Sequence, residues 1–192
     1  LTGRFLMGRL RGAMSQAERA RLESMVEHVE WIDRPTRLNH RGEVLHHSTM
    51  LIEGFILRSI DRDGRRHAVS FHVPGDFVDL HAFPLKRLDH NLDSVGRVKV
   101  GHVPHAAINR VMEDEPHLAR LFWFSTLLDA AMHREWIMAL ELMTTPRRIA
   151  HILAEVWRRL DMVGLSHPDG FDTPLTQSDL SEICGATAIH TN

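Results

Sequence analysis

Histidine is the residue type in this chain with the widest capacity for chemistry, because imidazole binds metals and transfers protons near neutral pH. The sequence contains 15 histidines, and the tightest pairs are His46-His47 and His102-x-x-His105. Successive side chains on a strand point to opposite faces, so His46 and His47 would rarely chelate one ion together. No cysteine or carboxylate cluster stands beside either pair, so we expect neither a metal site nor a haem.

The other reactive groups give little support for catalysis. Cys184 is the single cysteine, which excludes an intrachain disulfide and a cysteine-ligated iron–sulfur cluster. The sequence has no nucleophile elbow, P-loop or metal-catalytic motif. We therefore expect a protein that is not an enzyme, with no catalytic residues and no cofactor.

Composition sets the class of protein. The chain has 192 residues, of which 43% are hydrophobic, and its net charge is -2. This is enough for one good core, or for a core and a small satellite domain. No run of 18 apolar residues occurs and no signal peptide is recognised, so we expect a cytoplasmic protein. A near-neutral charge means that any claim of DNA binding must come from a local motif.

The last stretch, LTQSDLSEICGATAIHTN, supplies such a motif. Thr176 is a predicted N-cap with Asp179 three residues later, a near capping box. Gly185 suits a left-handed turn, and Thr187 is the candidate cap of a second helix. Helix, glycine turn and capped helix are the parts of a helix-turn-helix, although an ordinary helical hairpin has the same parts.

The elements that would position this motif can be recognised from the spacing of apolar residues, which changes along the chain. Residues 15–29 have apolar residues at helical spacing after the capping pair of Ser15 and Glu18. Short stretches rich in β-branched and aromatic residues follow, and a DRDG turn joins the first two of them. Several short strands with turns between them predict an all-β sandwich or jelly roll. The predicted strands are 50–60, 66–73 and 93–104.

A long helix is predicted over 116–142, and a second over 144–160. The first is apolar on more than one side, which is typical either of a core helix buried all round or of a dimerisation helix. A heptad row defines the predicted dimer interface: Leu121, Phe124, Leu128, Ala131, Met138 and Leu142.

The order of these elements, with LIEGFI and DRDGRRHAVSFHVPGDFVDLHAF in the β region, resembles the Crp/Fnr family of bacterial transcription regulators. The resemblance covers nearly the whole chain. It implies an α+β fold: an N-terminal double-stranded β-helix (jelly roll), a long dimerisation helix and a truncated C-terminal winged helix-turn-helix. The implied domains are 1–115, 116–143 and 144–192.

The resemblance also implies which residues contact DNA. In the family, the start of the first motif helix and the cap of the second hold phosphate, which agrees with the free N–H groups at helix N-termini. An arginine expected directly after Asn192 would contact bases. The implied DNA-binding residues here are Thr176, Gln177, Ser178, Thr187, Ala188, Ile189, His190 and Asn192.

Cyclic-nucleotide-binding relatives carry a Gly-Glu pair and later an Arg followed by Ser or Thr. Here Asp79-Leu80 stands at the first position and LDHNLDS at the second, with no arginine before a Ser or Thr. A cyclic phosphodiester needs a cation and free amides, so we expect no binding of cyclic AMP or cyclic GMP. The corresponding effector pocket would involve Asp79, Leu80, His81 and Asn91.

These inferences together predict a cytoplasmic homodimer that binds double-stranded DNA at a palindromic promoter site. RNA polymerase is a candidate partner, and no membrane partner is expected. The alternative is a stand-alone β-roll sensor or protein-interaction module without a DNA role.

Overall fold

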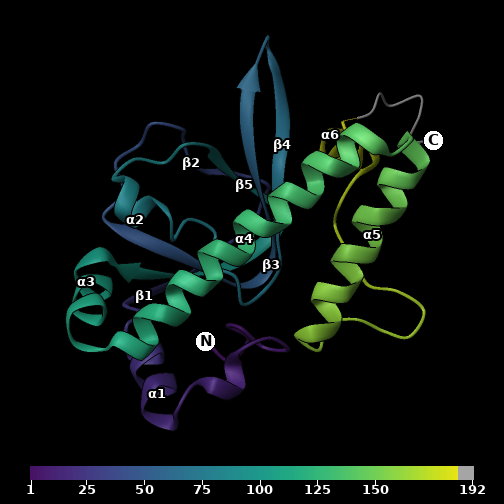
Figure 1. Cartoon of the computed structure of the whole chain (residues 1–192). Helices are drawn as coiled ribbons and strands as arrows, with labels where there is room; N and C mark the ends of the chain where they lie inside the picture. The colour runs from purple at the N-terminus through teal and green to yellow at the C-terminus, as the bar shows by residue number, and fades with distance from the viewer. Residues whose placement is uncertain (186–192) are drawn as a thin grey trace.

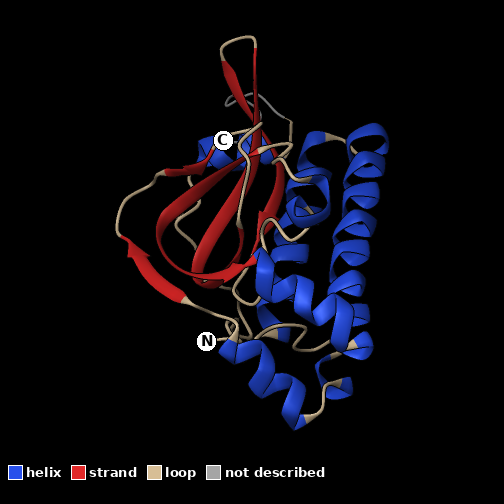
Figure 2. Cartoon of the chain, turned by 90° about the vertical axis from the view of Figure 1, so that its left-hand side faces the viewer, coloured by secondary structure: helices blue, strands red, loops and turns tan. Residues whose placement is uncertain are grey.

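The structure, a computed structural model, describes residues 1–185 of the chain. It has a mixed α+β architecture, in which a curved sheet lies on one side and most of the helices lie on the other (Figure 2). The α+β class is therefore confirmed. The predicted residues Thr187, Ala188, Ile189, His190 and Asn192 lie outside the described part of the chain.

A single antiparallel sheet dominates the first half of the chain. Its strand order is β1-β5-β3-β4, and β2 pairs with β5. Two long strands form its centre, because β3 and β5 pair along most of their length. The finer description as a jelly roll stays a prediction. The strands are β1 (His28–Ile32), β2 (Arg37–Asn39), β3 (His47–Arg62), β4 (Arg65–His72) and β5 (Asn91–Pro104).

The hairpin of β3 and β4 confirms the turn predicted from DRDG. Asp63 and Gly64 both have positive φ angles, 53° and 72°. Two successive positive φ angles are typical of the type I′ turn, whose twist matches that of the flanking strands. The hairpin projects beyond the rest of the sheet (Figure 1).

Helices form the second layer. Helix α1 (Gln16–Ser24) begins with the predicted capping box of Ser15 and Glu18. It ends before Val29, so the prediction of a helix over 15–29 was wrong at its C-terminal end. Val29 lies instead in β1, opposite Gly101 of β5. Pairing along a sheet edge prevailed there over local helical periodicity.

The predicted long helix is α4 (Pro116–Leu142), which crosses in front of the sheet in Figure 1. The helix predicted at 144 is α5 (Thr145–Met162). Among residues 1–185, no helix is long and apolar enough to cross a membrane. The remaining helices are the 3-10 helix η1 (Arg11–Ala13), α2 (Ala82–Leu85), α3 (His105–Asp114) and α6 (Gln177–Ile183).

Helices α5 and α6 share a core with the sheet. Phe55 and Phe71 of the β3–β4 hairpin stack with ring centroids 5.2 Å apart. Ile152 and Val156 of α5 and Ile183 of α6 belong to the same buried cluster. The C-terminal helices are thus anchored to the β region by hydrophobic burial. The proposed division at residue 144 stays a prediction.

Gly54 allows the sheet to curve. Its φ angle is +85°, and the pairing of β3 with β5 shifts register between Leu51 and Glu53 and again between Glu53 and Phe55, where Gly54 lies. A Cβ atom at this position would collide with the carbonyl oxygen of Arg97. A register shift with a glycine is the usual signature of a β-bulge, which bends a strand.

We predict that Gly54→Ala destabilises the fold by roughly 3 kcal/mol or more, because the side chain adds a collision to the cost of a positive φ angle. Gly64→Ala is the matched control, since Gly64 also has a positive φ angle but nothing lies within 4 Å of its Cβ position. The control should lose only about 1 kcal/mol. Urea unfolding of both variants measures the difference, and equal losses would contradict the role of the close approach.

Candidate functional site

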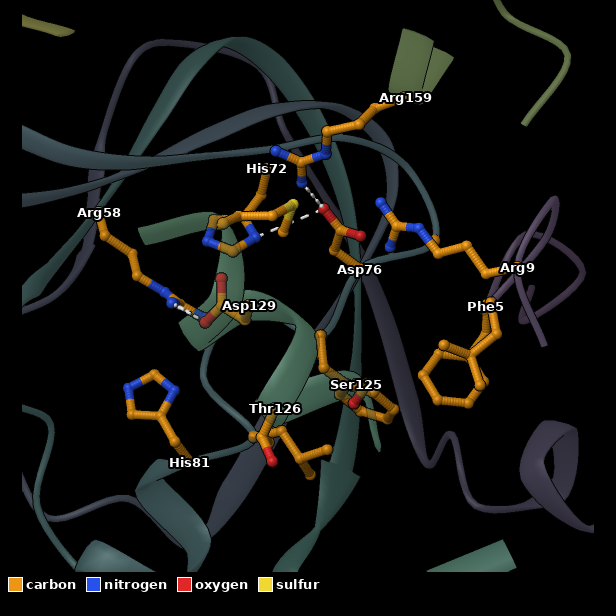
Figure 3. Close-up of a pocket in the computed structure, with 15 residues that line it drawn as sticks. Phe5, Arg9, Arg58, His72, Asp76, His81, Ser125, Thr126, Asp129 and Arg159 are labelled. Atoms are coloured by element: carbon orange, nitrogen blue, oxygen red, sulfur yellow. Dashed lines mark hydrogen bonds and ion pairs between the residues drawn. The ribbon is translucent and has the colours of Figure 1, made fainter. Parts of the chain in front are cut away.

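A cavity lies between the sheet and α4 (Figure 3). Its space for water-sized groups is small, about 30 Å³. The walls come from segments far apart in sequence: the N-terminal segment, β3, the loop after β4, α4 and α5. The lining side chains that carry charge or ring nitrogens are Arg9, Arg58, His72, Asp76, His81, Asp129 and Arg159.

Arg58 connects the sheet to α4. Its Nη1 forms an ion pair with Asp129 of α4, and its Nε donates to the carbonyl oxygen of Val78 at 2.7 Å. The Arg58 side chain is nearly inaccessible, with 3% of the residue exposed. A buried guanidinium needs such partners, because an unpaired charge in the interior is strongly destabilising.

Arg159 makes the equivalent connection from α5. Its Nη2 lies 2.5 Å from Oδ2 of Asp76, and its Nη1 donates to the carbonyl oxygen of Phe71 at 2.7 Å. His72 approaches the same oxygen, with Nδ1 3.5 Å from Asp76 Oδ2. Figure 3 shows both ion pairs, Arg58–Asp129 and Arg159–Asp76, among the residues that line the cavity.

Burial and charge act in opposite directions on these acids. Burial alone would raise the pKa of Asp76, but Arg159 and His72 outweigh it and hold the pKa well below its usual range. Burial would also raise the pKa of Asp129, but the charge of Arg58 outweighs it and lowers this pKa to about 2. Burial, reinforced by Arg58, lowers the pKa of His72 to about 4. At neutral pH both acids are therefore ionised, and His72 is neutral.

The predicted effector residues divide into two groups. Leu80 and His81 line the cavity. Asp79 and Asn91 do not line it: Asp79 is fully buried and accepts a hydrogen bond from the Thr49 N–H at 2.5 Å, while Asn91 accepts one from the Arg41 N–H. Burial raises the pKa of Asp79 to about 7. Both side chains are buried in the β region, where they accept hydrogen bonds from backbone N–H groups. This corrects their predicted placement at the cavity.

Sequence reasoning missed the buried charges. Neither Arg58 nor Arg159 was singled out from the sequence, since their partners lie 71 and 83 positions away in the chain. One signal was available for Arg159, since it lies beside Val156 and Leu160 on the apolar face of α5. An arginine within an apolar row is typically paired when buried.

Helix α6 begins as the sequence predicted. Thr176 Oγ1 accepts from the Asp179 N–H at 3.2 Å, and the Asp179 carboxylate accepts from the Thr176 N–H at 2.9 Å, so a complete capping box is present. Thr176, Gln177 and Ser178 are exposed. Gly185 takes the predicted positive φ angle, 57°. Whether these residues contact DNA stays a prediction.

Arg66 of β4 fixes α6 to the hairpin. Its Nη2 lies 2.7 Å from Oδ1 of Asp179, and its Nε lies 2.7 Å from Oε2 of Glu182. The first motif helix therefore lies beside β4 (Figure 1), with its N-terminal turn at the surface.

The predicted dimer row lies partly inside the protomer. Leu121 is only 4% exposed and packs in its own core, so it is not available to a partner chain, which corrects its assignment. Phe124, Leu128 and Ala131 are half-buried. Met138 and Leu142 are exposed, and their place in a dimer interface stays a prediction.

Comparison with known proteins identifies transcription regulators. No family model matches the chain. AadR, a transcriptional activatory protein of Rhodopseudomonas palustris, is 26% identical over 182 residues, which cover 92% of this chain and 72% of AadR. FixK, a nitrogen fixation regulation protein of Bradyrhizobium diazoefficiens, is 26% identical over 125 residues. FnrL, a transcriptional activator of Cereibacter sphaeroides, is 29% identical over 130 residues.

The matches to FixK and FnrL each cover 65% of this chain, which spans about half the length of both relatives, 52% and 51%. Among solved structures, FixK2 of Bradyrhizobium japonicum has a TM-score of 0.76 at 19% identity and covers 85% of this chain and 80% of its own. A CRP-family regulator of Thermus thermophilus has a TM-score of 0.68 at 16% identity, covering 84% and 80%. The resemblance to Crp/Fnr transcription regulators is confirmed in sequence and in fold.

We predict that Asp76→Asn costs about 3 kcal/mol at neutral pH, because it removes the nearer of the two carboxylates that pair with the buried Arg159 and leaves only Glu155, at 3.3 Å. The carboxylate of Asp76 has a folded-state pKa below its unfolded value, so its contribution is present above pH ~4 and is lost as pH falls through the folded pKa. The variant should therefore show a weaker loss of stability on acidification. Urea unfolding between pH 7 and 3 measures both effects.

Asp61→Asn is the matched control. Asp61 pairs with Arg37 at the surface, where the partners are solvated and the pair contributes little. An equal loss in both variants would show that the buried ion pair has no special role.

Proposed function

We propose that this protein is a DNA-binding transcription regulator that acts as a homodimer at a palindromic promoter site. The observation that carries the proposal is the sequence similarity to AadR over almost the whole chain. The relatives FixK and FnrL are also named as regulators of transcription or of nitrogen fixation. Such a protein acts in the cytoplasm, and RNA polymerase is a candidate partner in the same proposal.

The exposed first turn of α6 supports a DNA contact. The N–H groups of a first helical turn have no partner within the helix, and together with the helix dipole they attract phosphate. Gln177 and Ser178 occupy this turn and are open to solvent. We propose that they contact the DNA backbone, and that the residues after Gly185 supply the base contacts.

The exposed side of α4 supports a dimer. Trp123, Leu127 and Ile137 are 64%, 55% and 62% exposed. Ala130 lies between them, so the spacing follows steps of four, three and seven residues, which is that of a coiled-coil seam. The row is interrupted at Arg134, but so many large exposed apolar side chains along one side of a helix are unusual on the surface of a monomer. We propose that two α4 helices pair along this row, with Met138 and Leu142 beside it.

The cavity supports the proposal that cyclic AMP is not the effector. Two of the three arginines that line the cavity, Arg58 and Arg159, already pair with carboxylates, and the third, Arg9, lies in the field of the Asp76 carboxylate. Arg87, which follows the turn after α2, donates to the carbonyl oxygen of Gly42 at 3.0 Å. A cyclic phosphate at Arg58 or Arg159 would have to displace an existing partner, and at Arg58 it would be repelled by Asp129. At Arg9 it would approach the negative charge of Asp76.

The same charges suggest how a signal would reach the DNA. Asp129 lies on α4 and Arg159 on α5, and both are tied to the sheet across one cavity. A ligand or partner that separates either pair would shift α4 or α5 relative to the sheet. In a dimer, such a shift changes the spacing of the two motif helices and thus the match to two half-sites.

The alternative function is a stand-alone sensor or protein-interaction module. It requires the same β region and α4, but it makes no use of an exposed capped turn at α6. Selection of bound fragments from random double-stranded DNA by the full-length protein separates the two. Enrichment of an inverted repeat supports the regulator, and absence of enrichment at low salt supports the alternative.

We predict that Gln177→Glu weakens DNA binding about tenfold, because it places a negative charge against phosphate. The same charge is favourable for the helix itself, since acids stabilise a helix N-terminus. Fluorescence anisotropy with the selected DNA measures the affinity, and thermal unfolding confirms the fold.

Gln16→Glu is its control. Gln16 holds the equivalent first position of α1, which is also capped by a capping box. The control should bind DNA like the parent protein. Equal affinities of all three proteins would contradict the contact at α6.

We predict that Leu127→Glu or Ile137→Glu converts the dimer to a monomer, because each places a charge in the centre of an apolar seam. Light scattering coupled to size exclusion measures the mass. Val44→Glu is the control, since Val44 is exposed in the loop before β3. A parent protein that is monomeric at micromolar concentration would contradict the proposed dimer.

A further inference from the structure

Two histidines and a carboxylate that lie apart in sequence come together beside the cavity. His81 is the residue before α2, while Asp89 and His90 lie just before β5. The Nε2 atoms of the two histidines are 2.9 Å apart. Oδ1 of Asp89 lies 3.2 Å from Nε2 of His81 and 3.5 Å from Nε2 of His90. One potential ligand atom from each residue thus points to a common centre.

These separations match those of metal ligands. Ligands at ~2.0–2.1 Å from a tetrahedral ion are ~3.3–3.4 Å apart, and neighbouring ligands of an octahedral ion are ~3.0 Å apart. Three atoms separated by 2.9, 3.2 and 3.5 Å can therefore surround one ion with small side-chain adjustments. Within the described residues, this is the group of three or more His, Cys, Asp or Glu side chains that satisfies such spacing.

The ring of His90 is held in the orientation that a ligand needs. Its Nδ1 lies 3.1 Å from the carbonyl oxygen of Asn91, an interaction in which Nδ1–H donates. This leaves the lone pair on Nε2, which faces His81 and Asp89. Metal-binding histidines usually donate their second ring N–H to a carbonyl or carboxylate in this way. His90 is 5% exposed, so its ring has little freedom to turn away.

Without a metal ion, the close approach of the Nε2 atoms of His81 and His90 is only weakly favourable. Only one proton can lie between them, and a second proton on the pair would place two positive charges at hydrogen-bond distance. Arg58, whose charge lies near His90, adds to this repulsion, although Asp129 partly neutralises it. A divalent cation held by three lone pairs replaces that single shared proton, and the ionised Asp89 offsets part of its charge.

We propose that His81, Asp89 and His90 form a site for a divalent first-row transition metal, with zinc as the reference ion. Two imidazoles and one carboxylate are a donor set that suits zinc and its neighbours better than calcium or magnesium. Asp89 is exposed and the group borders an open hollow between the sheet and α4, so a fourth position is accessible to water or to another ligand.

The site goes beyond the proposed role in transcription, because metal binding requires neither DNA nor a dimer. It joins the segment at α2 to the start of β5, and His81 also lines the cavity that holds the Arg58–Asp129 pair (Figure 3). Sequence analysis expected no metal because it weighed only histidines close together in the chain. His81 and His90 are nine positions apart.

The test is titration of the metal-free full chain with Zn²⁺ by calorimetry, and with Co²⁺ by visible absorption. We expect one ion per chain, Co²⁺ bands that report nitrogen and oxygen ligands, and a rise in the thermal midpoint with Zn²⁺. His81→Ala and Asp89→Asn should each weaken Zn²⁺ binding by at least ~10-fold. Both positions are accessible enough that the fold should persist, and circular dichroism checks this.

His102→Ala is the matched control, because its side chain is 20% exposed, against 23% for His81, and also pairs with a carboxylate, Glu30. It should bind Zn²⁺ like the parent chain. Absence of stoichiometric binding, or binding that His102→Ala abolishes while His81→Ala and Asp89→Asn leave it intact, would overturn the proposal.

Discussion

The arrangement of this chain depends on keeping two buried arginines neutralised. Arg58 and Arg159 reach into the space between the sheet and the helices, where an unpaired guanidinium would be prohibitively costly. Each pairs with a carboxylate and donates to a backbone carbonyl from another element. The requirement fixes α4 and α5 against the sheet more specifically than apolar packing does, because hydrophobic burial has no direction whereas these bonds do.

Elements governed by local chemistry were predictable from sequence. The DRDG turn, the cap of Thr176 and the long helix after Pro116 each depend on residues within a few positions of one another. Helix α1 is shorter than predicted because the residues after it pair, as β1, with β5, a strand about 70 residues away in the chain. The same limit hid both ion pairs, since no local pattern in the sequence records which distant acid faces a given arginine.

The candidate functional residues show the same contrast between features set by neighbouring residues and features set by distant contacts. The first turn of α6 was located correctly, since a capping box marks it, whereas its contact with DNA remains a proposal. The effector residues were assigned by alignment of motifs, which places residues along the chain but does not give the direction of their side chains. Leu80 and His81 therefore lie at the cavity, whereas Asp79 and Asn91 turn inward. The metal-binding group lies outside any linear motif and becomes visible only once the segment after α2 is folded.

Arg66 gives the position of α6 a property that its packing alone would not have. Because the two acids that it holds are near the surface, added electrolyte weakens their attraction to it. The DNA backbone loses its attraction for proteins under the same conditions, through its counterions. If α6 contacts DNA as proposed, added salt would weaken the attachment of α6 to the hairpin and its contact with phosphate at the same time, and DNA binding would depend on salt more steeply than the number of phosphate contacts implies.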